Sequence, residues 1–375
     1  MFDRTLISVS SKSLTQCLPG WQPRTERSPR VLGVVRGEGI GPEVVDGALI
    51  VLDAAMRRSG LRLDVRRARE SGGHRIEECV EFCRSIFAAG GAVLCGPMGG
   101  RFVYDLRAAF DLYCKLVPLR PSPALADVSI VRPERLTGVD VVIVRENVGG
   151  LYFGESGRRE GGRVAYQHVF YSADQVVRII EAAARLARLR RGRLSVVVKT
   201  GGVPEVSALW SEHAETVASA HRVDLEVIEA DNASFQLVAD PGRFDVVVAP
   251  NLFGDLLADA ATVLLGTRGM SYSANFGPEG RAVYQTGHGA AHDLAGTDRA
   301  NPVAQILSVA MLLRESFALT REALRIDSAV ESVLASGIRT PDIAGPGSRT
   351  VGTRALAERI AIEASSIGGE ETEVA

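Results

Sequence analysis

The chain has 375 residues, of which 46% are hydrophobic and 23% are charged, and its net charge is −2. This length allows a large core or two domains, and the composition is that of a globular protein. The nearly balanced charge gives no electrostatic reason to expect binding to nucleic acid or to an anionic membrane. No apolar run reaches the length of a membrane span, and the five cysteines have neither zinc-site spacing nor the even number of a disulfide framework. We therefore expect a protein of the reducing cytoplasm.

The first part of the chain, residues 1–30, is rich in serine, arginine and proline and has little periodicity. It lacks the continuous apolar core of a secretory signal, although a weak transit-peptide character is an alternative. We expect an N-terminal extension that is flexible or loosely packed, and we leave it out of the fold prediction.

From Val31 onward, short β-branched runs alternate with amphipathic helical segments. This alternation predicts an α/β fold with a largely parallel sheet, in which ligands gather beyond the carboxyl ends of the strands. The arginine-rich face of the helix in 172–192 is expected to be solvated. The expected strands lie in 31–37, 91–95, 139–147, 193–199 and 243–251, and the clearest helices lie in 42–60 and 172–192.

Several expected strands end in side chains that are capable of chemistry. Arg145 ends one strand and is followed by Tyr152, while Asp231 follows another apolar stretch. Lys199 leaves an apolar strand beside glycines, where desolvation would lower its pKa toward use as a general base. Each of these residues alone is more often structural, but together they suggest a metal and anion site.

The segment NLFGDLLADA, residues 251–260, places Asp255 and Asp259 four positions apart. On a helix these two carboxylates lie on one face, where like charges repel each other. Either the pair faces water or it holds a cation.

Eight segments, in this order, make the chain similar to the β-decarboxylating dehydrogenase family, which contains isocitrate, isopropylmalate, homoisocitrate and tartrate dehydrogenases. The resemblance runs from about Val31 to about Ile362 and implies two α/β domains with a cleft between them. A large cofactor-binding domain would comprise 31–112 and 267–365, and a small domain, 113–266, would carry the dimer interface and the metal ligands. The segments are RGEGIGPEVV, LRAAFDLY, VIVRENVGGLYFG, EADNASFQLV, FDVVVAPNLFGDLLAD, SYSANFG, HGAAHDLAGTDRANP and GIRTPDIAG.

The resemblance implies roles for the candidate residues. Asp255 and Asp259 would bind a divalent cation together with Asp231 of the partner subunit of a homodimer, and hard oxygen ligands suit Mg²⁺ or Mn²⁺. Lys199, also from the partner, would be the general base, and Tyr152 would protonate the enol carbon after decarboxylation.

The same resemblance implies roles for three arginines and for the cofactor segment. Arg107, Arg120 and Arg145 would bind the carboxylates of the substrate, because guanidinium groups pair well with carboxylates. The adenosine of the cofactor would lie among three residues of the segment HGAAHDLAGTDRANP, which are His288, Gly289 and Asn301.

The same segment bears on the choice of dinucleotide. Asp293 and Leu294 stand where NADP-dependent members have lysine and tyrosine. An aspartate there would repel the 2′-phosphate of NADP and accept hydrogen bonds from ribose hydroxyls, so NAD is the expected cofactor.

The chain also departs from the family pattern around the substrate. Val117 replaces an arginine, with Lys115 nearby, and Arg101 stands where members discriminate the variable group of the substrate. Arg101 would contact that group or, alternatively, face solvent. Gly201 replaces an asparagine near the nicotinamide, and Gln285 replaces an acidic residue.

We therefore expect NAD-dependent oxidative decarboxylation of a 3-substituted malate with a non-standard substituent, a small-molecule 2-hydroxy acid. One alternative is a tartrate- or malate-type dehydrogenase of the same family, and another is a non-catalytic regulatory subunit. The sequence leaves open which hydroxy acid is bound and whether decarboxylation accompanies oxidation.

Overall fold

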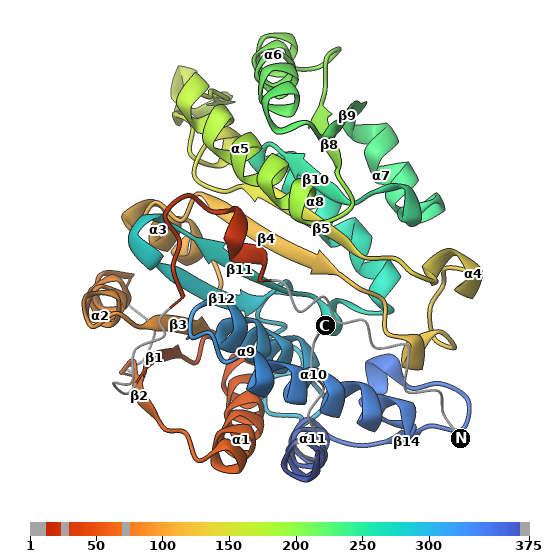
Figure 1. Cartoon of the computed structure of the whole chain (residues 1–375). Coiled ribbons are helices and arrows are strands. Elements are labelled where there is room, and N and C mark those ends of the chain that lie inside the picture. The colour runs from red at the N-terminus through yellow and green to blue at the C-terminus, as the bar shows by residue number, and fades with distance from the viewer. Residues whose placement is uncertain (1–12, 24–29, 70–75, 368–375) are drawn as a thin grey trace.

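A ten-stranded sheet runs through the computed structural model, which describes residues 13–23, 30–69 and 76–367 (Figure 1). The strand order is β2-β1-β3-β12-β11-β4-β5-β10-β8-β9, and neighbouring strands are parallel except around β11 and β4. Strand β11 is antiparallel to both β12 and β4, and β4 is antiparallel to β5. This confirms the predicted α/β fold with a largely parallel sheet.

The strands of this sheet are β1 (Arg30–Val35), β2 (Leu63–Arg67), β3 (Ala92–Cys95), β4 (Cys114–Leu119), β5 (Val141–Glu146), β8 (Arg193–Val198), β9 (Asp224–Glu229), β10 (Val246–Ala249), β11 (Tyr272–Phe276) and β12 (Ala282–Thr286). Two small sheets are formed by β6 (Ser156–Arg159) with β7 (Val164–Gln167), and by β13 (Ile338–Arg339) with β14 (Arg349–Thr350).

The α-helices are α1 (Gly41–Ser59), α2 (Ile76–Ala88), α3 (Phe102–Ala109), α4 (Pro133–Leu136), α5 (Ala173–Leu189), α6 (Pro204–His221), α7 (Ala230–Ala239), α8 (Asn251–Ala260), α9 (Val303–Glu315), α10 (Thr320–Ala335) and α11 (Thr353–Ser366). Among the described residues, no helix has the length and apolar character needed to cross a membrane.

Helices cover both faces of the sheet. At the β1 end, α2 and α3 enclose a smaller core on one face, while α1 and α9 to α11 pack into the main core with the other. At the β9 end, α5 and α6 pack against the strands, and α7 and α8 lie beside them (Figure 1). All five cysteines are buried.

The expected domain ranges divide the sheet between β11 and β4, so each range contributes five adjacent strands. The two halves are joined by backbone pairing, for example between Ala274 and Leu116. The main hydrophobic core also contains residues of both ranges. The division into two domains with a cleft therefore stays a prediction.

The N-terminal segment 13–23 packs closely, so the prediction of a loosely packed extension is wrong for this stretch. Leu14, Cys17 and Leu18 are buried in the main core. The backbone N–H groups of Leu14 and Thr15 donate to the buried carboxylate of Glu315 at 3.1 and 3.0 Å. The short 3₁₀ turn Leu14–Cys17 also contacts α5. The rest of that prediction concerns residues 1–12 and 24–29, which lie outside the described residues.

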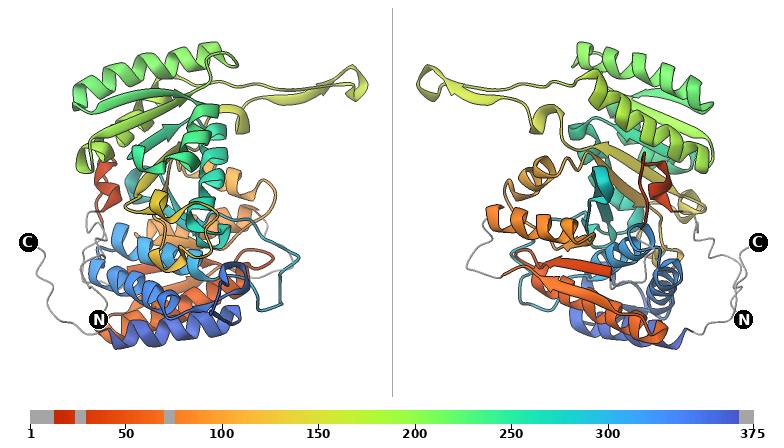
Figure 2. Two further views of the ribbon diagram at one scale, coloured as in Figure 1. Left: turned by 90° about the vertical axis from the view of Figure 1, so that its right-hand side faces the viewer. Right: turned by 60° about the vertical axis from the view of Figure 1, so that its left-hand side comes forward.

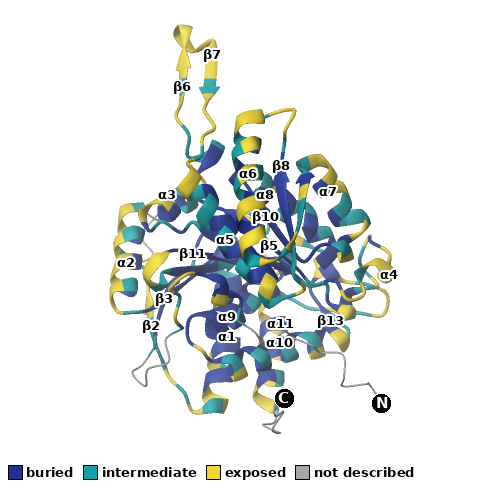
Figure 3. Cartoon of the chain, turned by 45° about the horizontal axis from the view of Figure 1, so that its top comes forward, coloured by how far each residue is buried: buried dark blue, intermediate teal, exposed yellow. Residues whose placement is uncertain are grey.

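The hairpin of β6 and β7 projects from the body as a long arm (Figure 2). Most of its residues are exposed (Figure 3). A two-stranded hairpin has little stability alone in water, so an arm of this kind is expected to pack against another surface.

Candidate active site

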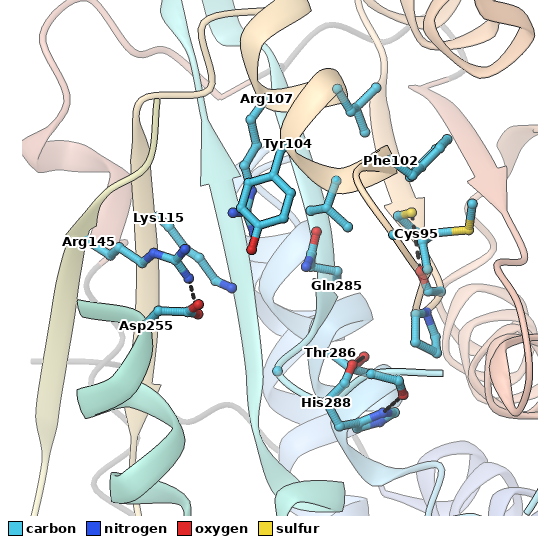
Figure 4. A pocket seen from close by; sticks show the side chains of 18 residues that line it. Cys95, Phe102, Tyr104, Arg107, Lys115, Arg145, Asp255, Gln285, Thr286 and His288 are labelled. Carbon is cyan, nitrogen blue, oxygen red and sulfur yellow. Dashed lines mark hydrogen bonds and ion pairs between the residues drawn. The ribbon is translucent and has the colours of Figure 1, made fainter. Parts of the chain in front are cut away.

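A pocket of about 190 Å³ opens between α3, the sheet and α8 (Figure 4). Side chains from four elements converge on it: Arg107 on α3, Lys115 on β4, Arg145 on β5 and Asp255 on α8. Asp255 is the one acidic residue among the described residues that line the pocket. The remaining lining residues are Cys95, Gly96, Pro97, Met98, Gly100, Phe102, Val103, Tyr104, Leu106, Gln285, Thr286, Gly287, His288 and Gly289.

Asp255 organises one side of the pocket. Its carboxylate forms an ion pair with Arg145 and accepts a hydrogen bond from the hydroxyl of Tyr152 at 3.0 Å. Arg145 is also fixed by Asn251, whose side-chain oxygen accepts from Nε at 3.0 Å and from Nη2 at 2.7 Å. Arg145 and Tyr152, both predicted from the sequence, thus meet at the predicted metal ligand Asp255.

The pKa values of Asp255 and Tyr152 are shifted in opposite directions in this cluster. Burial acts to raise the pKa of Asp255, but the charges of Arg145 and Lys115 outweigh it and lower the pKa. Burial and the neighbouring Asp255 raise the pKa of Tyr152 above its ordinary value. Tyr152 therefore keeps its proton at neutral pH and can serve as a proton donor.

Tyr104, on α3, forms an aromatic wall beside this cluster. Its ring centroid lies 5.2 Å from that of Tyr152, and the guanidinium of Arg107 stands 5.4 Å from it. Arg107 is 5% exposed. Burial lowers its pKa to about 9, which leaves the guanidinium charged at neutral pH.

The two aspartates of α8 lie one turn apart, but they have different partners. Asp259 forms an ion pair with Arg268, whereas Asp255 faces Arg145. Asp231 is placed elsewhere, and no three histidine, cysteine or acidic side chains of the described residues cluster as a metal site. Two carboxylates with hard oxygens fit part of a Mg²⁺ or Mn²⁺ site.

Lys199 lies outside the pocket, together with Asp231. Its ammonium group is 3.2 Å from Asp231 and 3.7 Å from Glu229, and its side chain is 38% exposed. The hydrogen bond to Asp231 raises the pKa of Lys199. The predicted lowering by desolvation is therefore wrong for the isolated subunit, because the lysine stands in solvent between two carboxylates.

Two predicted substrate arginines do not reach the pocket. Arg120 follows β4 at the end opposite Lys115 and donates to Asp140 at 2.9 Å, so its predicted role in substrate binding is wrong for this pocket. Arg101 is 66% exposed, pairs weakly with Asp105 at 4.0 Å and stacks on Tyr104 at 5.6 Å. Of the two alternatives predicted for Arg101, the structure of the subunit favours the one in which Arg101 faces solvent.

The predicted cofactor segment borders the other side of the pocket. His288 and Gly289 line it, and His288 Nε2 is buried without a hydrogen-bond partner. Asn301 anchors the end of the segment by donating to Asp342 at 3.2 Å. Gly39 has φ of +57°, and a Cβ atom there would lie 1.9 Å from the carbonyl oxygen of Ala290, so only glycine allows the two loops to meet.

The residues that would choose between NAD and NADP lie within the same segment. Asp293 is exposed, while Leu294 packs partly against the small cluster of Ile40 and Val44. The carboxylate of Asp293 is thus free to face an incoming nucleotide.

Sequence reasoning missed three residues of the site. Tyr104 lies one helical turn before Arg107, a spacing that could have placed it on the same face. Lys115 was noted only as a neighbour of Val117, and Asn251 carried no signal for its role in holding Arg145.

Comparisons with known proteins show the family of the chain. The family model described as "Isocitrate/isopropylmalate dehydrogenase" matches residues 31–360. The chain is 39% identical over 355 residues to a 3-isopropylmalate dehydrogenase of Gloeobacter violaceus, covering 88% of this chain and 96% of the relative. It is 38% identical over 353 residues to that of Desulfitobacterium hafniense, covering 88% and 98%.

A solved structure, isocitrate dehydrogenase from Methylococcus capsulatus, is also similar. Its TM-score is 0.78 at 30% sequence identity, covering 90% of this chain and 99% of that chain. Because the family model spans most of the sequence and the fold agrees, the chain belongs to the isocitrate/isopropylmalate dehydrogenase family.

Proposed function

We propose that the chain is an NAD-dependent and divalent-metal-dependent dehydrogenase that oxidises and decarboxylates a 3-substituted malate. The cluster of Arg145, Asp255 and Tyr152 carries this proposal, because it joins an anion-binding cation, a metal-ligand carboxylate and a protonated acid through direct contacts at Asp255, which lines the pocket. The family and its 3-isopropylmalate dehydrogenases support it.

The residues of the chain divide the chemistry among themselves. Arg107 and Arg145 hold the carboxylates of the substrate by charge-assisted hydrogen bonds. Lys199 of the partner subunit takes the proton of the 2-hydroxyl group as a hydride leaves C2, which makes C2 a carbonyl. The C3–C4 bond then breaks to release CO₂, and its electron pair moves toward the C2 carbonyl to give an enolate. Tyr152, held by Asp255, returns a proton to C3.

Two groups from outside the chain complete the site. When bound, Mg²⁺ or Mn²⁺ at Asp255 and Asp259 stabilises negative charge on the substrate oxygens. When bound, NAD along the segment from His288 to Asn301 accepts the hydride from C2.

A homodimer is part of this proposal, because Lys199 and Asp231 lie outside the subunit's own pocket. Large exposed apolar side chains support an interface on α7, α8 and the base of the arm. Phe235 is 67% exposed, Leu256 59% and Phe170 54%. A partner subunit on these elements would cover these side chains.

The variable group of the substrate is proposed to differ from that of isocitrate or isopropylmalate. Val117 is 2% exposed and adds no charge to the site, and Tyr104 occupies the α3 wall of the pocket (Figure 4). Tyr104 thus changes the surface that meets the substrate, whereas Val117 lies in the main core behind the residues that line the pocket.

The proposal is tested by following NADH formation with Mg²⁺ or Mn²⁺ over malate, tartrate, isocitrate, isopropylmalate and other 3-substituted malates. We expect metal-dependent turnover of one or more of them, with CO₂ release, and loss of activity on chelation. Isocitrate and isopropylmalate are expected to be turned over roughly tenfold or more slowly than the best substrate, since about 1.4 kcal/mol of lost transition-state binding suffices. Turnover without CO₂ would favour the tartrate- or malate-type alternative, and no NADH with any acid would favour the regulatory subunit.

NAD is expected to exceed NADP in kcat/KM, because the exposed Asp293 would face the extra phosphate. Exchanging Asp293→Lys together with Leu294→Tyr should narrow or reverse that preference. Steady-state kinetics with both cofactors measure the ratio, and equal use of both by the unmodified protein would contradict this assignment.

A further inference from the structure

Lys115 and Arg107 are buried basic residues of the pocket that form no ion pair among the described residues. They are 7% and 5% exposed. Among the described residues, Lys115 has neither a hydrogen bond nor an ion pair, and Arg107 Nε is without a hydrogen-bond partner. Arg145 differs, since Asp255 and Asn251 already hold it.

The backbone explains why Lys115 reaches this place. In the sheet it stands opposite Arg145 on β5 and opposite Asn275 on β11. Side chains alternate along a strand, so Val117 and Leu119 share its face, and both are apolar. Lys115 is therefore the cation that β4 presents to the pocket, beside Arg145 and across from the α3 wall (Figure 4).

Positive charge on both of these buried side chains is energetically unfavourable while the pocket is empty. Burial lowers the pKa of Lys115 well below its ordinary value, and the charges of Arg107 and Arg145 lower it further. Asp255 offsets only part of this repulsion and is already engaged with Arg145. Buried charges in proteins are normally paired, which points to a partner that arrives with the ligand.

We propose that Lys115 is a substrate-binding residue that forms, with Arg107, a two-cation subsite for one carboxylate of the substrate. The inference rests on the proposed function, which supplies a dicarboxylate. The carboxylate beside the 2-hydroxyl belongs near Asp255 and its metal, so the subsite receives the C4 carboxylate. Lys115 contributes a compact point charge and Arg107 a planar fork, and the two can hold both oxygens of one carboxylate.

The test is a binding cycle between protein and ligand, measured by calorimetry in Mg²⁺ without turnover. The ligands are malate and the malate analogue in which an amide replaces the C4 carboxylate. In the unmodified protein the amide should bind at least 30-fold more weakly, because it loses two charge-assisted contacts. In Lys115→Met, which keeps the apolar stem, this penalty should fall by tenfold or more. The same penalty in both proteins would overturn the proposal.

Matched variants separate binding from structure. Lys115→Arg keeps the charge and should retain most of the binding penalty of the amide. Lys115→Gln is a second neutral variant, which should behave like Lys115→Met. It replaces Lys115→Met in the test if Lys115→Met does not fold. Leu116→Met alters the opposite face of β4 and should leave the penalty unchanged. A reduced penalty in Leu116→Met would show that any disturbance of the strand suffices and would overturn the assignment.

This experiment is independent of the dehydrogenase assay. A lysine-dependent penalty without NADH formation from any hydroxy acid would retain the subsite and reject the proposed reaction. NADH formation with an unchanged penalty would retain the reaction and reject the subsite.

Discussion

Mixed dimers of the inactive variants Lys199→Ala and Asp255→Ala are expected to recover about half of the unmodified activity. If each site combines Asp255 of one subunit with Lys199 of the other, a mixed dimer has one site with both residues intact. Random pairing makes about half of all dimers mixed, so the unfractionated preparation should show about a quarter of the unmodified activity and the purified mixed dimer about half. The placement of Lys199 beside Asp231, outside the pocket of its own subunit, supports this expectation.

The measurement is NADH formation after two differently tagged variants are co-expressed and the doubly tagged dimer is purified. Each variant alone is the control and should retain less than about a thousandth of the activity, since a base and a metal ligand are removed. If purified mixed dimers are as inactive as the parents, the residues act within one subunit and the shared site is wrong.

Replacement of Asp245 by alanine is expected to lower the free energy of unfolding by about 3–5 kcal/mol, the usual cost of breaking a buried ion pair. Asp245 is fully buried, and its carboxylate accepts from Arg190 Nε and from the backbone N–H of Arg191, both at 2.8 Å. The substitution leaves Arg190, which is 9% exposed, facing Asp140 as its remaining anion.

Urea unfolding followed by circular dichroism measures this loss. Asp224→Ala is the matched control, because Asp224 is exposed on the edge strand β9, and it should change stability by no more than about 0.5 kcal/mol. A loss of under about 1 kcal/mol for Asp245→Ala would mean that water or a rearranged Arg190 replaces the pair.

The buried parallel strands could be predicted because β-branched runs with polar ends have few alternative structures. The antiparallel strands β4 and β11 could not, since their pairing joins Leu116 to Ala274, and nothing local specifies a partner so distant in the chain. The arginine-rich face of α5 was predicted to be solvated, yet Arg178 pairs with Asp111 at 2.8 Å and stacks on Tyr113. An arginine shows no sequence signal that separates these two environments.

The residues of the site likewise fall into those that the sequence predicted and those that it did not. Residues with a distinctive motif, such as Asp255 and Tyr152, were predicted and are brought together. Lys115 was not, because a single lysine in an apolar strand is ordinarily a surface residue, and only the three-dimensional pairing shows that it faces a pocket. Arg120 was assigned to the substrate by the family resemblance, although it follows the far end of β4 and donates to Asp140.

The docking of the N-terminal segment on Glu315 has a consequence for biosynthesis. Leu14 and the carboxylate that accepts from it are 301 positions apart. At about 5–20 residues per second, translation needs roughly 15–60 s to make the second partner after the first. During that time Leu14, Cys17 and Leu18 lack the surface that later buries them. The nascent chain therefore exposes an apolar segment that chaperones can bind until Glu315 has been made.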